Sequence, residues 1–176
     1  MRKVVAYELV SLDGVAEDPE VFVTDFDDAM QENLNDVIAS QDTVLLGHRM
    51  YDEWARFWPA SEIEPFATFI NNVEKYVAAS TPLTENWPHA SALEGDLVSF
   101  VTSLKQRSGG DIGVHGSITL VQSLLELGVI DELRLVVAPT LQFHGRRLFE
   151  RGVPTRLSLT SHSVSPSGYL LLDFRA

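Results

Sequence analysis

Short apolar runs alternate with amphipathic stretches along most of the chain. Four runs rich in branched residues have the length and composition of buried strands, at 4–10, 43–47, 75–79 and 112–115. The amphipathic stretches between them carry apolar residues at helical spacing, and the first begins at Asp27 or Asp28, either of which can cap it. This alternation predicts an α/β fold with a mostly parallel central sheet and helices on both faces.

The second half of the chain contains the clearest single unit. An apolar strand at 112–115 is followed by a helix at 118–127, which ends before Gly128, and by a second strand at 133–138. The connection is long enough to set the two strands parallel, as in a βαβ unit. The turn His115-Gly116-Ser117 directs unpaired N–H groups outward from a helix N-terminus, where phosphate is attracted. We predict a dinucleotide diphosphate there, although similar turns occur in α/β proteins that bind nothing at that corner.

The C-terminal part of the chain has a different pattern. A helix capped by Asp96 is expected to stop at Gly109-Gly110, before the βαβ unit. After a loop at 141–152, alternating residues at 157–159 and the apolar run 169–174 flank a Ser-Pro-Ser-Gly turn, which predicts an antiparallel C-terminal hairpin. No linker or repeat interrupts this order, so a single domain over residues 1–176 is expected.

Three strand–helix corners carry small residues at the predicted strand ends. They are Gly47, Ser80 and Gly116. Ligands of parallel sheets bind at the carboxyl ends of the strands. We therefore expect these three corners to meet at one edge of the sheet and to form one anion-accepting cleft.

Composition narrows the classes of partner. The 176 residues carry a net charge of −12, which argues against a nucleic-acid backbone or an anionic membrane surface as partner. The chain has no cysteine, and its five histidines show no paired helical spacing, so no metal site is expected. No apolar stretch approaches the ~20 residues that span a bilayer, and a soluble cytoplasmic protein is the expectation. The chain also lacks the Gly-x-Ser-x-Gly turn of serine hydrolases.

The order and spacing of several segments resemble a known family. LLGHRMYDEW, KYVAAST and IGVHGSITLVQSLLELGVIDELRLVVAP, together with SLDG near the start and GRRLF near position 145, resemble the dihydrofolate-reductase-like family. The likeness is greatest to the reductase domain of the bacterial riboflavin-biosynthesis enzyme and its small stand-alone relatives, and it covers essentially the whole chain. Two motifs depart from the family pattern: its Gly-Arg-x-Thr-Tyr is here 47–51, GHRMY, and its Gly-Gly is His115-Gly116.

The resemblance implies NADPH as cofactor, a small-molecule substrate and a homodimer. It implies that two helix starts approach the cofactor phosphates and that a third corner lies near the adenosine. The residues so implied are Gly47, His48, Arg49, Met50, Ser80, Thr81, His115, Gly116, Ser117 and Ile118. A guanidinium such as that of Arg49 can hold a phosphate through paired N–H donors, whereas the alternative is a solvated arginine at a helix start.

Catalytic residues are harder to choose from the sequence. Hydride transfer often needs a proton donor, and the candidates are Asp13 in the first loop and Asp27, Asp28 or Glu32 on the first helix, with Asp13 and Asp28 as the named catalytic residues. Asp13 is as well suited to tie its own turn, and Asp27 and Asp28 to cap a helix. Asp13, Gly14 and Tyr51 are the candidate substrate contacts, with core packing as the alternative for Tyr51.

The expected function is an NADPH-dependent reductase of a small heterocycle, with the riboflavin-pathway aminopyrimidine ribosyl phosphate as the named candidate. The alternative is a non-catalytic nucleotide- or pterin-binding module of the same fold. Two departures from the family pattern favour this alternative: His115-Gly116 stands in place of Gly-Gly, and Met50 stands in place of the threonine.

Overall fold

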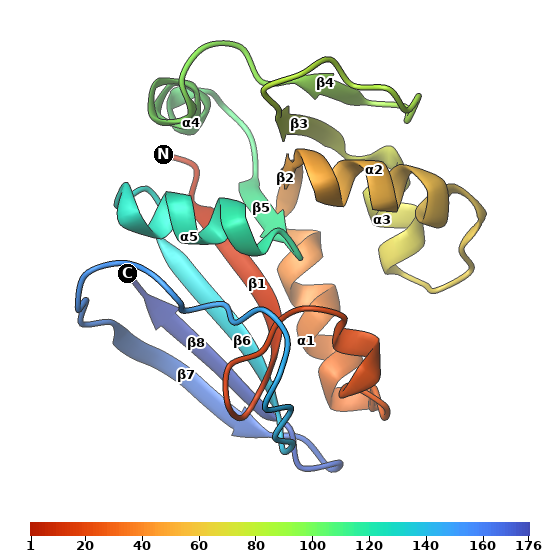
Figure 1. The fold of residues 1–176 in the computed structure, drawn as a ribbon, viewed down its shortest axis with the longest axis vertical. Coiled ribbons are helices and arrows are strands. Elements are labelled where there is room, and N and C mark those ends of the chain that lie inside the picture. Colours follow the sequence, from red (N-terminus) through yellow and green to blue (C-terminus); the bar gives the residue numbers. More distant parts are fainter.

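The computed structural model describes residues 1–176 and contains one eight-stranded sheet (Figure 1). The strand order is β4-β3-β2-β5-β1-β6-β8-β7. All neighbouring pairs from β4 to β6 are parallel, whereas β8 runs antiparallel to β6 and to β7. The strands are β1 Val4–Ser11, β2 Gln41–Gly47, β3 Glu74–Ala78, β4 Ala90–Ala92, β5 Asp111–His115, β6 Glu132–Ala138, β7 Ser158–Val164 and β8 Leu170–Arg175.

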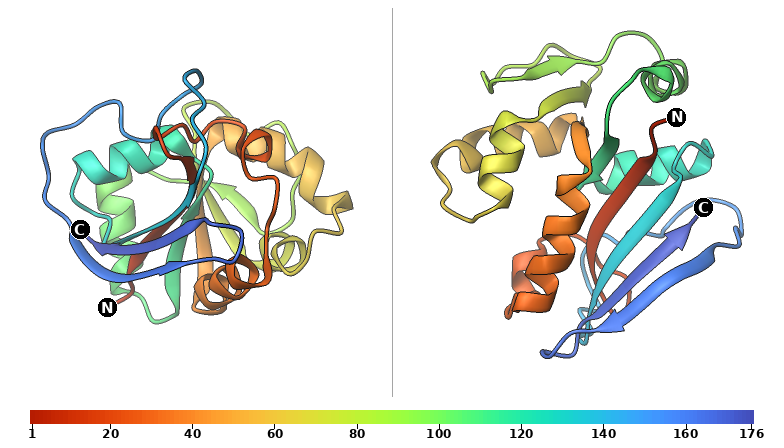
Figure 2. Two further views of the ribbon diagram at one scale, coloured as in Figure 1. Left: turned by 90° about the horizontal axis from the view of Figure 1, so that it is seen from below. Right: turned by 180° about the vertical axis from the view of Figure 1, so that it is seen from behind.

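Five α-helices and two short 3₁₀ turns complete the fold. They are η1 Pro19–Val21, α1 Asp28–Ala39, α2 His48–Phe57, η2 Trp58–Ala60, α3 Phe66–Asn72, α4 Leu97–Gln106 and α5 Ile118–Glu126. Helices α4 and α5 cover one face of the sheet, and α1 and α3 cover the other (Figure 2). None of the helices has the length and apolar character needed to cross a membrane.

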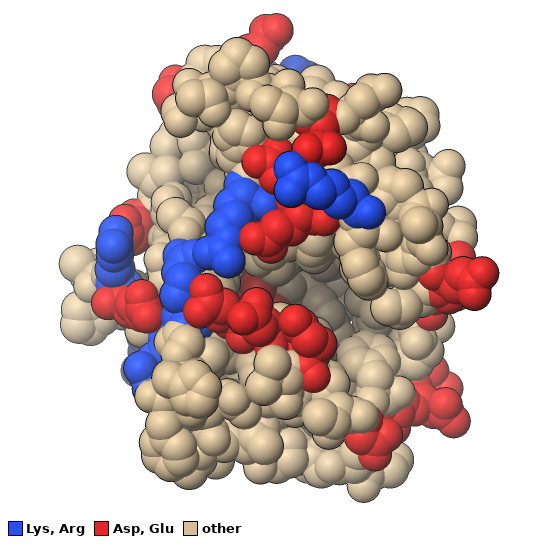
Figure 3. Space-filling model, turned by 45° about the vertical axis from the view of Figure 1, so that its right-hand side comes forward, with Lys and Arg blue, Asp and Glu red and all other residues tan.

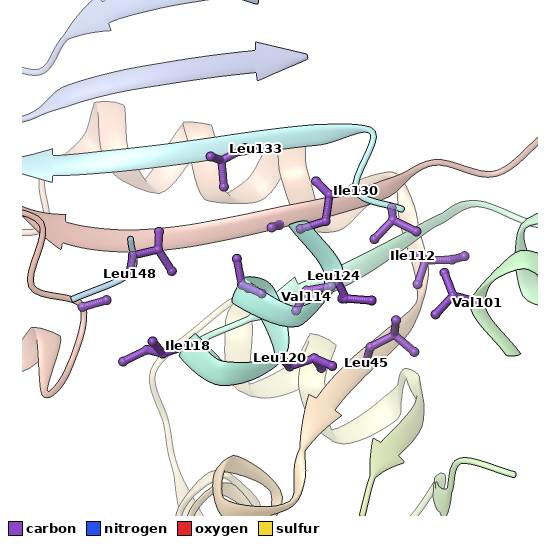
Figure 4. Close-up of a cluster of buried hydrophobic side chains, with 14 of the residues drawn as sticks. Leu45, Val101, Ile112, Val114, Ile118, Leu120, Leu124, Ile130, Leu133 and Leu148 are labelled. Atoms are coloured by element: carbon purple, nitrogen blue, oxygen red, sulfur yellow. The ribbon is translucent and has the colours of Figure 1, made fainter. Parts of the chain in front are cut away.

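The largest core cluster lies between the sheet and helices α4 and α5 (Figure 4). Alternate residues of β1 enter it, namely Val4, Ala6 and Val10, because successive strand side chains point to opposite faces. Tyr7 belongs to the cluster on the α1 face instead. The central strand β1 therefore contributes to both layers of the molecule.

The predicted fold class is confirmed, with a mostly parallel sheet, helices on both faces and an antiparallel C-terminal pair. The predicted helix caps and the glycine predicted after α5 are also confirmed. Asp27 accepts a hydrogen bond from the Met30 N–H at the start of α1, and Asp96 accepts one from Ser99 at the start of α4. Gly128 follows α5 with φ of +64°, a conformation that glycine adopts without strain.

Two details of the sequence prediction were wrong. The prediction missed β4, because Ala-Ser-Ala is too short and too small to give an apolar pattern. Helix α4 ends at Gln106, and the next four residues lead to β5, so Gly109-Gly110 is not its terminus. The two strands of the predicted βαβ unit are parallel, as expected, and β1 lies between them.

Candidate functional site

Three strand ends meet at one edge of the sheet, as the sequence predicts. Strand β2 ends at Gly47, β3 ends two residues before Ser80, and β5 ends one residue before Gly116. Since β3, β2 and β5 are parallel neighbours, their carboxyl ends share the same edge. Two contacts join the corners: the Gly47 N–H donates to Ser117 Oγ at 3.0 Å, and Thr81 Oγ1 lies 3.4 Å from His48 Nδ1.

Two helix N-termini lie side by side at this edge. Gly47 precedes α2 and Ser117 precedes α5, and neither gives its helix a side-chain cap. The Ser117 hydroxyl instead accepts from the Gly47 N–H, which links the two helix starts. The first N–H groups of each helix have no intrahelical acceptor, and each helix dipole adds positive potential there. This pair of N-termini forms an anion-accepting arrangement in a chain of net negative charge.

Gly116 shapes the turn between β5 and α5. Its φ is +62°, and a Cβ there would lie 3.0 Å from the indole of Trp54 and 3.4 Å from the Met50 methyl group. A larger residue would therefore be strained and would push against α2. The glycine keeps the two helix starts close together.

The edge also lies at a topological switch point of the sheet. The chain leaves β5 for α5 on one face, and it leaves the neighbouring β1 for α1 on the other face. In open α/β sheets, ligands bind outside the carboxyl ends of two strands whose connections diverge in this way. The switch point thus lies between β1 and β5, beside the Gly116 turn.

Arg49 is a charged group in the first turn of α2. Its side chain is 64% exposed, with Nε 2.9 Å from Glu53 and Nη1 3.7 Å from Glu17. The hydrogen bond to Glu53 raises the pKa of the Arg49 guanidinium. On the face that Figure 3 shows, acidic and basic side chains lie beside one another around a hollow. Any phosphate held by Arg49 competes with these carboxylates.

Asp13 joins two loops. Its carboxylate accepts from Ser11 Oγ at 2.7 Å and from the backbone N–H groups of Gln142 and Phe143 at 3.0 and 2.9 Å, and Arg147 lies 3.5 Å away. The Gln142 and Ser11 hydrogen bonds hold the pKa of Asp13 well below its usual range. Such a carboxylate stays ionised near neutral pH and therefore has no proton to donate. Its hydrogen bonds hold the two loops together.

The two aspartates at the start of α1 have separate roles. Asp27 caps the helix and also accepts from the Ser167 N–H in the C-terminal turn. Although burial alone would raise the pKa of Asp27, hydrogen bonds from Ser165, Ser167 and Met30 lower it to about 2. Asp28 is exposed in the first helical turn, where a negative charge favours the helix dipole. The catalytic role of Asp28 stays a prediction.

Two predicted site residues are instead buried in the core. Tyr51 is 1% exposed, and its hydroxyl donates to the Glu85 carbonyl at 2.6 Å, so the predicted substrate contact is corrected to a packing role. The His115 ring is buried between Phe66 and Phe69, with Nε2 2.7 Å from Gln41 Oε1. That ring lies on the face opposite α5, so only the His115 backbone remains near the Gly116 turn.

A model of the RibD C-terminal domain family matches residues 2–171 of the chain. The chain belongs to this family. The protein YyaP of Bacillus subtilis (strain 168) is 28% identical over 163 residues, which cover 84% of this chain and 80% of YyaP. An oxidoreductase is the class of activity that membership of this reductase-domain family supports.

Solved structures share the fold at low identity. A protein of Shewanella sp. PV-4 assigned to riboflavin biosynthesis superposes with a TM-score of 0.76, 16% identity and 98% coverage of both chains. A diaminohydroxyphosphoribosylaminopyrimidine deaminase/5-amino-6-(5-phosphoribosylamino)uracil reductase of Thermotoga maritima gives a TM-score of 0.72 and 16% identity, with 99% of this chain and 56% of that chain covered. The dihydrofolate-reductase-like fold expected from the sequence is thereby confirmed.

Two residues of this RibD C-terminal domain were not among the predicted site residues. Glu8, on β1, is 2% exposed, and its Oε1 has no hydrogen-bond partner. Arg146, in the loop after β6, donates from Nη2 to Thr119 Oγ1 in the first turn of α5 at 2.7 Å. The signal for Glu8 was an acid within an apolar strand, and the signal for Arg146 was the GRRLF motif.

Two hollows have different surroundings. One of about 110 Å³ is lined by the loop after β1, from Val15 to Val21, and by Gln142, His144 and Gly145, so it lies toward the carboxyl edge. The other, of about 380 Å³, is lined by Lys3, Glu132 and neighbouring polar residues at the amino edge. The larger hollow is far from the strand–helix corners, and its lysine and glutamate pair with each other at 2.6 Å.

Proposed function

We propose that this RibD C-terminal domain is an NADPH-dependent reductase that transfers hydride to a small heterocycle. The named candidate substrate is the aminopyrimidine ribosyl phosphate, 5-amino-6-(5-phosphoribosylamino)uracil. One observation carries the proposal: the uncapped N-termini of α2 and α5, held together by the Gly47–Ser117 hydrogen bond at a switch point of the sheet. The uracil reductase activity named for the Thermotoga maritima relative supports the choice of substrate.

The residues at this edge fit the parts of NADPH. The first N–H groups of α5, from Ile118 onward, suit the diphosphate, and Arg146 adds a cation beside Thr119 in the same turn. The start of α2, with His48 and Arg49, suits a further phosphate, and Ser80 and Thr81 are exposed beside it for the adenosine. When bound, the reduced nicotinamide supplies the hydride. The chain itself binds and orients the cofactor and shields the reacting atoms from water.

A matched pair of glycine variants tests the cofactor site. Gly116 and Gly128 have nearly equal φ, +62° and +64°, but only Gly116 has neighbours within 4 Å of the position that an added methyl group would take. Gly116→Ala should weaken NADPH binding at least tenfold, measured by the fluorescence of the bound nicotinamide, whereas Gly128→Ala should leave it unchanged. Equal affinity of both variants for NADPH would contradict the proposed site.

Turnover separates an enzyme from a binding module. We expect oxidation of bound NADPH, followed at 340 nm, with aminopyrimidine ribosyl phosphate and slower or no oxidation with pterins and flavins. Binding of NADPH without oxidation by any member of the panel would favour the non-catalytic nucleotide- or pterin-binding module. Absence of NADPH binding would refute the reductase proposal itself.

We also propose that the chain forms a homodimer. Strand β7 lies at the edge of the sheet, and all seven of its residues are exposed, with Leu159 and Val164 among the exposed apolar side chains. An unpaired edge of this length offers backbone groups to a second chain. Light scattering should give twice the 19.5 kDa of one chain, and Leu159→Lys should shift the mass toward the monomer. A wild-type mass of one chain would refute this proposal.

A further inference from the structure

Glu8 occupies an unusual position for an acid. It lies on the central strand β1, and strand alternation places it on the α5 face together with Ala6 and Val10. Its partner across the ladder to β6 is Leu135, which belongs to the same apolar cluster. The carboxyl group is thus enclosed by apolar side chains, and burial raises the pKa of Glu8 to about 8, against a smaller opposite effect of the Gly116 N–H. Near neutral pH the group is mainly a neutral carboxylic acid.

The pairing of β1 changes at this residue. Tyr7 pairs with His115, the last residue of β5, so Glu8 lies level with the Gly116 turn rather than with a strand. On its other side the ladder with β6 continues to Ser11. Glu8 therefore stands at the switch point between β1 and β5, next to the start of α5.

One oxygen of Glu8 is unsatisfied. Oε1 is fully buried and has no hydrogen-bond partner, a state that costs about 1–3 kcal/mol in a folded protein and that calls for an explanation. No charged side chain compensates it, since only burial and the Gly116 N–H affect its titration. A ligand group that reaches Glu8 from the carboxyl edge of the sheet would supply the missing partner.

We propose that Glu8 hydrogen-bonds the carboxamide of the bound nicotinamide and so fixes the orientation of the ring. A protonated carboxyl offers one O–H donor and one acceptor, and a primary carboxamide offers the complementary acceptor and N–H donors. The inference rests on the proposed function, because it places the nicotinamide end of NADPH on the α5 side of the switch point. Glu8 is then a binding and positioning residue that the sequence motifs do not mark.

Three probes separate the nicotinamide from the rest of the cofactor. They are NADPH, its 3-acetylpyridine analogue, which lacks the carboxamide N–H donors, and 2′-phospho-ADP-ribose, which lacks the nicotinamide. Dissociation constants are measured for wild type, Glu8→Leu and Glu8→Gln by calorimetry. Glu132→Gln serves as a control, because this acid lies at the start of β6, at the opposite edge of the sheet.

Glu8→Leu should weaken NADPH about tenfold, the loss expected for one or two hydrogen bonds, and should leave 2′-phospho-ADP-ribose within about twofold of wild type. Wild type should prefer NADPH over the acetylpyridine analogue, and Glu8→Leu should lose that preference. Glu8→Gln, whose amide keeps a donor and an acceptor, should restore most of the affinity. Circular dichroism should show both variants folded, because each removes a buried ionisable group.

The outcomes also separate this inference from the proposed function. If wild type binds all three probes and Glu8→Leu weakens none of them, or all of them equally, the role of Glu8 is refuted while the cofactor site stands. If wild type binds none of the probes, both proposals fall. Selective loss of NADPH, with rescue by glutamine, supports both.

Discussion

The unpartnered carboxyl of Glu8 should leave a signature in the pH dependence of stability, even without a ligand. The folded state holds the Glu8 proton up to a pKa of about 8, whereas the unfolded chain releases it near 4.5. Stability from this group is therefore fully present below about pH 4.5 and is lost as pH rises through 8. At about 1.36 kcal/mol per pKa unit, the shift corresponds to roughly 5 kcal/mol over the whole range.

A narrower window isolates Glu8 from other groups. Between about pH 6.5 and 8, the linkage relation gives a loss of roughly 1.5 kcal/mol in the free energy of unfolding from Glu8 alone. Burial lowers the pKa of His115 to about 3, so its ring stays neutral in the folded state, and what the histidine of the unfolded chain contributes is the same in wild type and in any Glu8 variant. Lys75, whose pKa burial lowers to about 8, contributes equally to wild type and to any Glu8 variant.

Urea denaturation of wild type and Glu8→Gln, followed by far-UV circular dichroism at several pH values, measures this difference. The wild-type free energy of unfolding should fall relative to the variant by the amount above, and the variant should be the more stable protein at pH 8. The control variant Glu132→Gln should run parallel to wild type, because the Lys3 hydrogen bond keeps the pKa of Glu132 below its ordinary value despite burial. Parallel curves for wild type and Glu8→Gln would refute the assignment of a buried, protonated acid.

Three further measurements test other parts of the site. Arg49→Ala should weaken NADPH about tenfold more than NADH, because a guanidinium contributes most where a second phosphate is present; equal losses would remove Arg49 from that role. His115→Gln should lose about 1–2 kcal/mol less stability than wild type between about pH 6.5 and 5, because over this range the wild-type histidine binds a proton in the unfolded chain but not in the fold; an unchanged acid slope in urea titrations would contradict this. Gly116→Ala and Gly128→Ala should each lower the free energy of unfolding by about 1–2 kcal/mol through positive φ, and thermal denaturation should show the larger loss for Gly116→Ala, where Trp54 is in contact.

The sequence predicted the elements where local chemistry determines them. Asp27 and Asp96 cap their helices through their own side chains, and apolar periodicity located the long strands. Strand order has no such local signal. Nothing in the stretch 111–139 indicates that β1 inserts between β5 and β6, because that depends on which apolar faces find each other in the folded chain.

In the candidate site, too, the features with a local sequence signal were predicted and those that depend on distant partners were not. The three small-residue corners were predicted, since each is a short local motif at a strand end. The roles of Asp13 and Tyr51 depend on partners far along the chain, the Gln142 N–H and the Glu85 carbonyl, and no spacing rule relates them. Glu8 was visible only as an interruption of an apolar run. Its importance follows from where β5 ends.

The position of Glu8 connects the fold to the function that we propose. Strand β1 continues to Ser11 beside β6, but its pairing with β5 stops at Tyr7. From there the two strands lead to helices on opposite faces, the arrangement at which open α/β sheets bind their ligands. Tyr7 and Glu8 are the residues at this divergence, one pointing to each face, and both retain a buried oxygen without a partner. A protein selected for stability alone would fill these positions with apolar side chains, so the unsatisfied Glu8 carboxyl at the switch point agrees with the ligand contact that we propose.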